Sequence, residues 1–311
     1  MKYNNKVKVS VIIPIYNAKD TIKRTLDSLA SQTLSEFEVI LVDDGSNDGS
    51  STICDEYANN DNRFKVIHQL NSGVSKARQS GLRISTGEYS IHCDADDWVE
   101  PNMLEDLITK AQNDNSDIVI ADFYVNNGKS QTVSKQVPTS LNEKEILLDL
   151  MNNRLFGSLC NKLIKTELYF NNNISFFPGI NHCEDLLVCI QLFQLNKIKV
   201  SYLPKAYYHY YSNPNSITHN FTRKTYEMRL KFEKKLQEIL IIPEANYLCQ
   251  QVSFNIFSEA LIHRILTHKE IKEGLITHKS QIKKIKSLRW KLGFYFLSLN
   301  LNNIAYKFIH Y

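Results

Sequence analysis

Short apolar runs alternate with helical patterns through the first 93 residues of the chain. The run Val9–Ile13 is rich in β-branched residues and stops at Pro14, which is typical of a strand buried on both faces of a parallel sheet. Between successive runs, apolar residues such as Ile22, Leu26 and Leu29 recur at the spacing of a helix face. The four predicted strands are 9–13, 37–42, 64–68 and 88–93. This alternation predicts an α/β fold with a doubly wound, mostly parallel sheet flanked by helices.

A polar loop follows each of these four predicted strands. The loops are residues 14–17, 43–46, 71–78 and 94–97. Ligands of doubly wound sheets bind at the carboxyl ends of the strands, so the four loops should converge on one edge. Their glycines form neither a GxGxxG pattern nor a phosphate loop with its lysine, which excludes the usual dinucleotide-binding and NTPase folds. We therefore expect a metal ion and an arginine to make the phosphate contacts at this edge.

Three carboxylates, those of Asp94, Asp96 and Asp97, lie at the end of the fourth predicted strand. Like charges this close repel one another unless a cation or a set of donors neutralises them, and a hard divalent cation prefers oxygen ligands. The alternative is a solvated acidic turn before the helix that Pro101 opens, because Asp and Pro are both favoured at helix starts.

The predicted elements are less regular beyond Pro101. They are a helix over 101–112, a strand over 117–121, a hairpin or loop over 126–136, a helix over 155–168, a helix within 180–196 and a strand over 198–203. From Thr222 onward the pattern is helical, with breaks near Pro243 and Gly274.

The composition is that of an ordinary globular protein. The chain has 311 residues, 43% of them hydrophobic, which allows one large domain or one and a half. No apolar stretch reaches the roughly 18 residues that span a bilayer, and the short start before Val7 does not resemble a signal peptide. The six cysteines lack the paired spacing of zinc sites, so we expect reduced thiols in a cytoplasmic protein.

Basic residues are concentrated at the end of the chain. Residues 261–311 carry ten Lys or Arg against Glu270 and Glu273, whereas the net charge of the whole chain is only +4. Apolar residues recur at helical spacing over 282–299, which predicts one basic amphipathic helix. This helix would either contact a membrane peripherally through residues 280–300, on the inner face of the cell membrane, or pack on the catalytic domain or a second copy. We expect no nucleic-acid partner.

Four stretches of the chain, in this order, resemble the family 2 inverting glycosyltransferases. These enzymes have a GT-A fold and are common in the assembly of bacterial capsule, exopolysaccharide, lipopolysaccharide and teichoic acid. The stretches are VSVIIPIYNA (9–18), SQTLSEFEVILVDDGSNDGS (31–50), NSGVSKARQSG (71–81) and TGEYSIHCDADDWVEP (86–101), with weaker matches at HCEDLLV (182–188) and SIT (216–218). The resemblance implies a catalytic domain over 1–219, with nucleotide-sugar binding in 8–121 and the acceptor side in 122–219. Residues 220–311 then form a separate helical region.

On this resemblance, Asp94-Ala95-Asp96 matches the DxD motif of the family. Asp96 would bind Mn²⁺ or Mg²⁺ held on the diphosphate of the donor, and the cation would stabilise the leaving group without a proton transfer. Asp94 would face the ribose and Asp44 the base.

The resemblance assigns the nucleoside pocket to Pro14 and Tyr16, and it adds Gly73 and Arg78 to the residues around the donor. Tyr16 would stack on the base; the alternative is simple packing. Arg78 would pair with Asp44 or with a phosphate; the alternative is an arginine on a helix surface.

Asp185 matches the catalytic base of the family, which implies a single displacement with inversion at the anomeric carbon. The alternative is that Glu184 and Asp185 are first-turn carboxylates favoured by the helix dipole. Neighbours on a helix do not share a face, so we expect Glu184 to be turned away or to play a supporting part.

Two histidines are candidates for a further contact from a loop that closes over the donor. They are His209 and His219, and His219 is our candidate for a second metal ligand. The family often carries Arg in this stretch, where the chain has His209 and Ser212, so the resemblance leaves a cationic phosphate contact open here.

The leading hypothesis is a metal-dependent, inverting glycosyltransferase with a UDP-linked sugar donor and a glycan or lipid-linked oligosaccharide acceptor. A nucleotidyltransferase is an alternative, but it should show a glycine-rich phosphate loop that residues 14–18 lack. A non-catalytic nucleotide-sugar or carbohydrate-binding module is another, against which the intact Asp94, Asp96 and Asp185 argue.

Overall fold

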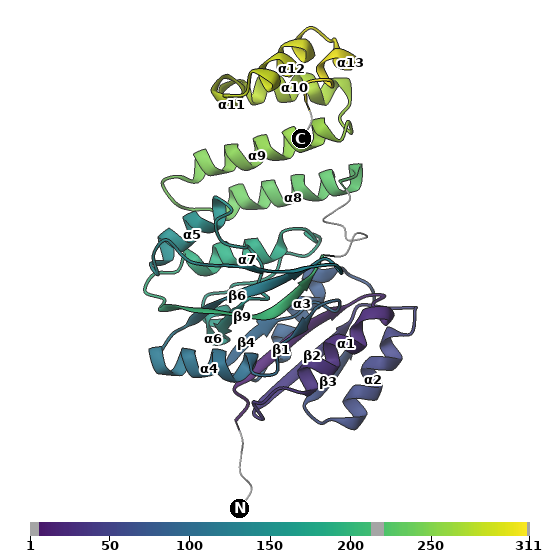
Figure 1. Cartoon of the computed structure of the whole chain (residues 1–311), viewed down its shortest axis with the longest axis vertical. Helices are drawn as coiled ribbons and strands as arrows, with labels where there is room; N and C mark the ends of the chain where they lie inside the picture. The colour runs from purple at the N-terminus through teal and green to yellow at the C-terminus, as the bar shows by residue number, and fades with distance from the viewer. Residues whose placement is uncertain (1–5, 213–220, 310–311) are drawn as a thin grey trace, which may run out of the picture. The chain divides into compact units, whose positions relative to one another are not determined.

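The computed structural model describes residues 6–212 and 221–309. The chain divides into two compact units, Met1–Asn213 and Pro214–Tyr311 (Figure 1). The N-terminal unit is a mixed α/β structure, and the described part of the C-terminal unit is helical. The sequence analysis placed the boundary of the catalytic domain after residue 219.

The first half of the sheet is parallel, as predicted. Its strands are β1 (Val9–Ile15), β2 (Phe37–Asp43), β3 (Phe64–His68) and β4 (Tyr89–His92). Strand β1 pairs in parallel with β2 and β4, and β2 pairs in parallel with β3. Every side chain of β2 is buried, which explains its unbroken apolar run.

Helices α1 (Lys19–Ala30), α2 (Ser50–Asn60) and α3 (Val74–Ile84) connect these strands (Figure 1). Helix α3 packs closely on β1, because a Cβ atom on Gly81 would lie 2.6 Å from Cγ2 of Ile12. The strand ends, and the loops that follow them, are therefore held together by tight helix–sheet packing.

The second half of the sheet mixes both strand directions. Its strands are β5 (Trp98–Val99), β6 (Ile118–Asn126), β7 (Gln131–Ser134), β8 (Lys162–Lys165) and β9 (Val200–Tyr211). The order across the sheet is β3-β2-β1-β4-β8-β6-β9-β5, with β7 paired to β6 in the hairpin expected over 126–136. Strand β8 is antiparallel to both β4 and β6, whereas β6 and β9 are parallel. The remaining helices of this unit are α4 (Met103–Asp114), α5 (Glu143–Met151), α6 (Glu167–Asn171) and α7 (Glu184–Phe193).

One prediction for this half was wrong, and one predicted strand is longer than expected. Residues 155–168 are not one helix: β8 fills the gap between β4 and β6, and this pairing between distant segments overrides the local pattern. The strand predicted over 198–203 continues through the tyrosine-rich segment to Tyr211. Pro204 lies at the register shift of β9, where a strand tolerates a residue without an amide donor.

The C-terminal unit consists, in its described part, of α8 (Arg223–Ile239), α9 (Ala245–Ile262), α10 (His268–Thr277), α11 (Lys279–Lys284), α12 (Leu288–Ser298) and α13 (Asn302–Ala305). Its core includes Phe257, Leu261, Phe294 and Leu297. No helix in the described segments is both long and apolar enough to cross a lipid bilayer.

The single amphipathic helix predicted over 282–299 is also wrong. The helix breaks between Lys284 and Leu288, and the Ser287 side chain accepts a hydrogen bond from the Trp290 amide as the cap of α12. The new start changes which face is buried: Phe294 and Leu297 lie in the core, whereas Leu292 is exposed.

Candidate active site

The loops after β2 and β3 are joined through the buried carboxylate of Asp44. Its Oδ1 accepts hydrogen bonds from the Gln69 side chain at 2.7 Å and the Ser72 amide at 2.9 Å, and its Oδ2 accepts one from the Gly73 amide at 2.8 Å. Gly73 has a φ of +88°, and a Cβ there would lie 2.3 Å from the Asn181 side chain. Glycine is therefore required both by the backbone and by the space at this point.

The loop after β1 presents Tyr16 to solvent. Pro14 lies within β1 beside Val42, and the Tyr16 side chain is 53% exposed. The Asn17 side chain accepts a hydrogen bond from the Asn47 amide at 2.9 Å, which ties this loop to the one after β2. Simple packing, the alternative for Tyr16, does not fit so exposed a ring.

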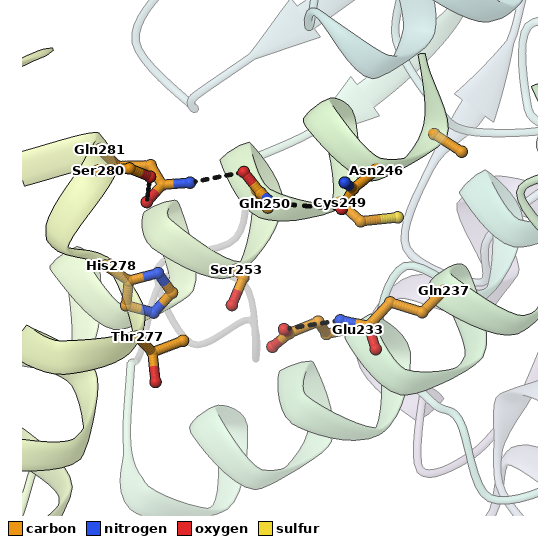
Figure 2. A pocket seen from close by; sticks show the side chains of 11 residues that line it. Glu233, Gln237, Asn246, Cys249, Gln250, Ser253, Thr277, His278, Ser280 and Gln281 are labelled. Atoms are coloured by element: carbon orange, nitrogen blue, oxygen red, sulfur yellow. Dashed lines mark hydrogen bonds between the residues drawn. The ribbon is translucent and has the colours of Figure 1, made fainter. Parts of the chain in front are cut away.

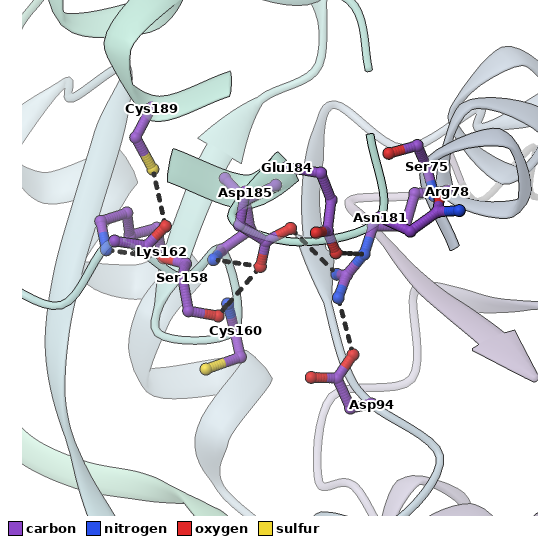
Figure 3. A network of polar contacts seen from close by, with 12 residues as sticks. Ser75, Arg78, Asp94, Ser158, Cys160, Lys162, Asn181, Glu184, Asp185 and Cys189 are labelled. Atoms are coloured by element: carbon purple, nitrogen blue, oxygen red, sulfur yellow. Dashed lines mark hydrogen bonds and ion pairs between the residues drawn. The ribbon is translucent and has the colours of Figure 1, made fainter. Parts of the chain in front are cut away.

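Arg78 of α3 is the central cation of the site. Its side chain is buried, and Nη2 lies 2.8 Å from Oδ1 of Asp94 (Figure 3). Its Nη1 lies 3.4 Å from Oδ1 of Asp185, and its Nε lies 3.6 Å from Oε1 of Glu184. Arg78 therefore joins the predicted DxD loop to the start of α7, instead of pairing with Asp44.

Glu184 is not turned away from the site, because the broad guanidinium of Arg78 reaches both neighbouring carboxylates of α7. Burial and the adjacent Asp185 raise the pKa of Glu184 to about 7. Burial also raises the pKa of Asp94, while Arg78 opposes this shift. The three acids share one buried cation, so the charge of the cluster is sensitive to pH near neutrality.

The two oxygens of Asp185 have different surroundings. Oδ2 accepts hydrogen bonds from the Ser158 hydroxyl at 3.0 Å and the Leu159 amide at 3.1 Å. Oδ1 is buried and accepts no hydrogen bond from any residue in the described ranges, although Arg78 lies near it. One oxygen is therefore fixed by two donors, and the other is buried and faces the Arg78 guanidinium.

Lys162 of β8 supports the loop that holds Asp185. It is fully buried, and its Nζ donates to the carbonyls of Phe156 and Ser158, each at 2.7 Å, and to Oδ1 of Asn161 at 2.9 Å. Burial lowers the pKa of Lys162. The sequence analysis did not identify this residue; a lysine beside an apolar pair was the only signal in the sequence.

The last acid of the Asp94–Asp97 loop holds the loop in shape. The Asp97 carboxylate accepts hydrogen bonds from the Tyr208 hydroxyl and, at 2.7 Å, from the Tyr211 amide. The Tyr208 hydroxyl in turn accepts one from the Asp94 amide at 2.9 Å. Burial and the neighbouring Asp94 raise the pKa of Asp97 well above its usual range. Two tyrosines of β9 thus anchor the acidic loop.

Helix α1 anchors the same loop from the other side. The hydroxyls of Thr21 and Thr25 donate to the Ala95 carbonyl at 2.9 and 3.1 Å, and Nη2 of Arg24 donates to the Asp96 carbonyl at 2.5 Å. These contacts also escaped the sequence analysis, because the residues belong to a predicted helix with no visible link to residues 94–97.

The Asp96 carboxylate is the member of this loop that fits a divalent cation. It forms no ion pair with any residue that the structure describes, and burial together with Asp94 raises its pKa to about 6. A partly buried carboxylate beside another acid gains from a hard cation, and its oxygens suit Mg²⁺ and Mn²⁺. Within residues 6–212 and 221–309, no three His, Cys, Asp or Glu side chains are grouped to hold a metal by themselves.

His209 is placed for packing. Its ring stacks between Trp98 and Tyr124, with centroid distances of 4.8 and 4.5 Å. Its Nε2 lies 2.9 Å from the Glu100 carboxylate, and its Nδ1 lies 3.3 Å from the Asn126 amide. With both nitrogens engaged, His209 is wrong as a candidate for a metal or phosphate contact. His219, the predicted second metal ligand, lies outside the described residues.

Two described glycosyltransferases are similar to this chain in sequence. A cholesterol galactosyltransferase of Borreliella burgdorferi is 38% identical over 217 residues, which is 66% of this chain and 60% of that protein. A poly(ribitol-phosphate) beta-N-acetylglucosaminyltransferase, TarP of Staphylococcus aureus, is 32% identical over 209 residues, 66% of this chain and 62% of that protein. The chain therefore matches less than two thirds of the length of these relatives.

Among solved structures, S. aureus TarS 1-349 in complex with UDP-GlcNAc superimposes with a TM-score of 0.68 at 22% sequence identity, covering 96% of this chain and 89% of that one. This likeness confirms the predicted GT-A fold. The model of the glycosyl transferase family 2 matches residues 10–170, more than half of the chain. The chain belongs to glycosyl transferase family 2.

Proposed function

We propose that the chain transfers a sugar from a UDP-linked donor to a hydroxyl of a bacterial cell-surface glycan or lipid-linked oligosaccharide, with inversion and with Mn²⁺ or Mg²⁺. The observation that carries this proposal is the pair of unequal oxygens on Asp185. Ser158 and Leu159 fix one oxygen of the carboxylate, and the other accepts no hydrogen bond from the described residues, so it can receive a proton from an acceptor hydroxyl that reaches it.

In this proposal Asp185 Oδ1 accepts the hydrogen bond of the acceptor hydroxyl and removes its proton as the hydroxyl attacks the anomeric carbon. Ser158 and Leu159 hold the carboxylate in orientation during the transfer. The guanidinium of Arg78 lies 3.4 Å from Oδ1 and fixes the side of the carboxylate that faces the Asp94 loop. A single displacement requires one base, which is the role proposed for Asp185.

Residues of the other loops would bind the sugar-nucleotide donor. Asp96 would hold the divalent cation, which would neutralise charge developing on the leaving diphosphate. Pro14 and the exposed ring of Tyr16 would receive the nucleoside. Asp44 is occupied by the amides of Ser72 and Gly73, so we propose that it acts on the base chiefly by shaping this loop. Asp94, held by Arg78, would face the ribose.

The described activities and bound ligands of similar proteins support a UDP-sugar donor and a glycan acceptor. TarS is solved in complex with UDP and with UDP-GlcNAc, and relatives are described as poly(ribitol-phosphate) glycosyltransferases. The nucleotidyltransferase and non-catalytic alternatives have no comparable support. None of the six cysteines forms a disulfide in the structure.

Release of UDP by the purified protein tests the proposal. UDP-glucose, UDP-galactose and UDP-GlcNAc are each incubated with the protein and Mn²⁺, with and without EDTA. We expect slow release of UDP from one donor, abolished by EDTA and by the Asp96→Asn substitution. Metal-independent release, or release from none of a full panel of nucleotide sugars, would contradict it.

A further inference from the structure

The C-terminal unit contains an open cavity of about 610 Å³ (Figure 2). A volume of this size is typical of small-molecule sites, which span roughly 300–1,000 Å³. Side chains of α8, α9 and the segment that joins α10 to α11 form its walls. They include Glu233, Gln237, Asn246, Gln250, Ser253, Thr277, His278 and Gln281.

The lining consists mainly of amides and hydroxyls held in a defined network. The Gln281 amide donates to Gln250 at 3.0 Å, and Gln250 donates to Asn246 at 3.2 Å. The Gln237 amide donates to Glu233 at 3.2 Å. Such a network orients donors and acceptors before any ligand arrives, which reduces the entropy that binding must offset.

His278 is a buried polar group of this cavity that lacks a partner. Its side chain is only 6% exposed, and its ring packs against Phe254 and Phe257, with centroids 5.6 and 5.0 Å apart. Neither ring nitrogen bonds to a residue in the described segments, and burial lowers its pKa so that the imidazole stays neutral. The ring nitrogens are not sealed from solvent, so water or a ligand in the open cavity can bond to them. Figure 2 shows His278, Ser253 and Glu233 directed at the same space.

The charges of the residues that line the cavity limit the chemical class of ligand that it can bind. Glu233 is the only formally charged side chain among the lining residues, and no Lys or Arg is present to bind a phosphate. Glu233, Cys249 and His278 are not grouped as metal ligands within the described ranges. The many polar groups are also unsuited to a lipid tail. A neutral ligand with several hydroxyls fits this set of donors and acceptors.

We propose that this cavity is a second carbohydrate site, which binds a neutral sugar residue of the acceptor glycan. Glu233 accepts hydrogen bonds from sugar hydroxyls, His278 bonds to one more, and the amides at the rim complete the contacts. The role of this sugar as part of the acceptor rests on the proposed function, whereas sugar binding itself does not.

Binding to the full-length protein tests this site. The neutral probes are the methyl β-glycosides of glucose, galactose and N-acetylglucosamine, and the anionic probes are glucose 6-phosphate and ribitol 5-phosphate. By titration calorimetry we expect saturable binding of at least one neutral probe and none of the phosphates. Glu233→Gln should weaken this binding by about tenfold, because it removes a charge-assisted acceptor. Glu238→Gln, an exposed position on the same helix, should leave it unchanged.

Two further variants keep the test independent of the catalytic site. Asp96→Asn should lose metal-dependent UDP release but keep sugar binding. Ser253→Ala, with circular dichroism as a check on folding, should weaken sugar binding if Glu233→Gln is unstable. Absence of neutral-sugar binding, equal binding by Glu233→Gln or Ser253→Ala, or preference for phosphates would overturn the site.

Enzyme kinetics test separately whether the bound sugar belongs to the acceptor glycan. Glu233→Gln should raise the KM for a glycan acceptor and leave kcat at saturation unchanged. A weakened sugar site with an unchanged acceptor KM would overturn that role. If no nucleotide sugar supports UDP release while neutral sugars still bind, the proposed function fails and the sugar site remains.

Discussion

Nη1 of Arg78 lies 3.4 Å from Oδ1 of Asp185, and the same guanidinium bonds to Asp94 at 2.8 Å. One buried cation thus connects the candidate base to the DxD loop, although the residues come from separate parts of the chain. This arrangement couples the charge of Asp185 to the charge of Asp94.

Removal of Arg78 should destabilise the protein in a pH-dependent way. Arg78→Met leaves Asp94, Glu184 and Asp185 without their cation, which should lower the free energy of unfolding by about 3–5 kcal/mol at pH 8. Burial and Asp185 raise the pKa of Glu184 to about 7, so fewer uncompensated charges remain below that pH. The loss should therefore shrink at pH 5.5. Urea unfolding at both pH values measures it, with the exposed Arg83→Met on the same helix as the control. An equal loss at both pH values would contradict the coupling.

Asp96→Asn should stabilise the metal-free protein at neutral pH. The folded-state pKa of about 6 is above the unfolded value of about 4, so the carboxylate lowers stability as pH rises through this interval. Replacement by Asn removes that penalty, worth about 1 kcal/mol after allowance for partial exposure. Thermal unfolding should show the gain at pH 7.5 and little difference at pH 4.

Metal provides the control for this measurement. Mn²⁺ with UDP should stabilise the wild-type protein and leave Asp96→Asn nearly unchanged. Equal stabilisation of both proteins, or an Asn variant that is less stable at pH 7.5, is incompatible with Asp96 as the metal ligand.

Lys162→Met should impair turnover more than donor binding. Methionine fills the same space but leaves the carbonyls of Phe156 and Ser158 without their donor, so the loop that orients Asp185 loosens. We expect kcat to fall about tenfold or more and the Kd for UDP to stay within about twofold. Lys165→Met, on the same strand, serves as the control. Unchanged kcat in a folded Lys162→Met protein would show that this loop does not position the base.

Much of the site's outline could be predicted from the sequence, because strand patterns and the loops after them are local features. Asp94 and Asp185 were both selected from the resemblance, and the structure brings them to one guanidinium. The partners of Arg78 and the burial of Lys162 depend on residues far away in sequence, which no local pattern records. Likewise, the segment 162–165 forms the strand β8 because it pairs with β4 and β6, which are distant in sequence.

The tail was harder to predict for another reason. The prediction over 282–299 rested on helical spacing alone and did not include the effect of the Ser287 side chain. This side chain caps the start of α12, and the new start shifts the buried face of the helix. The break leaves Leu288, Leu292 and Tyr295 exposed near several lysines. Peripheral membrane contact therefore stays a prediction. The apolar contact would be made by these three exposed side chains and not by one continuous apolar face over 282–299.

Vesicle co-sedimentation tests this contact. Each lysine near an anionic surface contributes about 1 kcal/mol, so binding should require anionic lipid and weaken in high salt. Joint replacement of Lys283, Lys284, Lys286 and Lys291 by Gln should reduce it by at least tenfold. Joint replacement of four lysines on α8, namely Lys224, Lys231, Lys234 and Lys235, by Gln is the matched control. Absence of binding, or equal binding to neutral vesicles, would assign the tail to packing alone.

Turnover of Asp185→Asn, with the donor that supports UDP release, tests the central claim most directly. Asn caps a helix about as well as Asp, so a purely structural Asp185 would tolerate the change. As the base, Asp185 should be needed for proton removal, and we predict that kcat falls by roughly 10² or more while the Kd for UDP with Mn²⁺ is unchanged. Turnover retained within a few-fold of the wild-type value would contradict the assignment of Asp185 as the base.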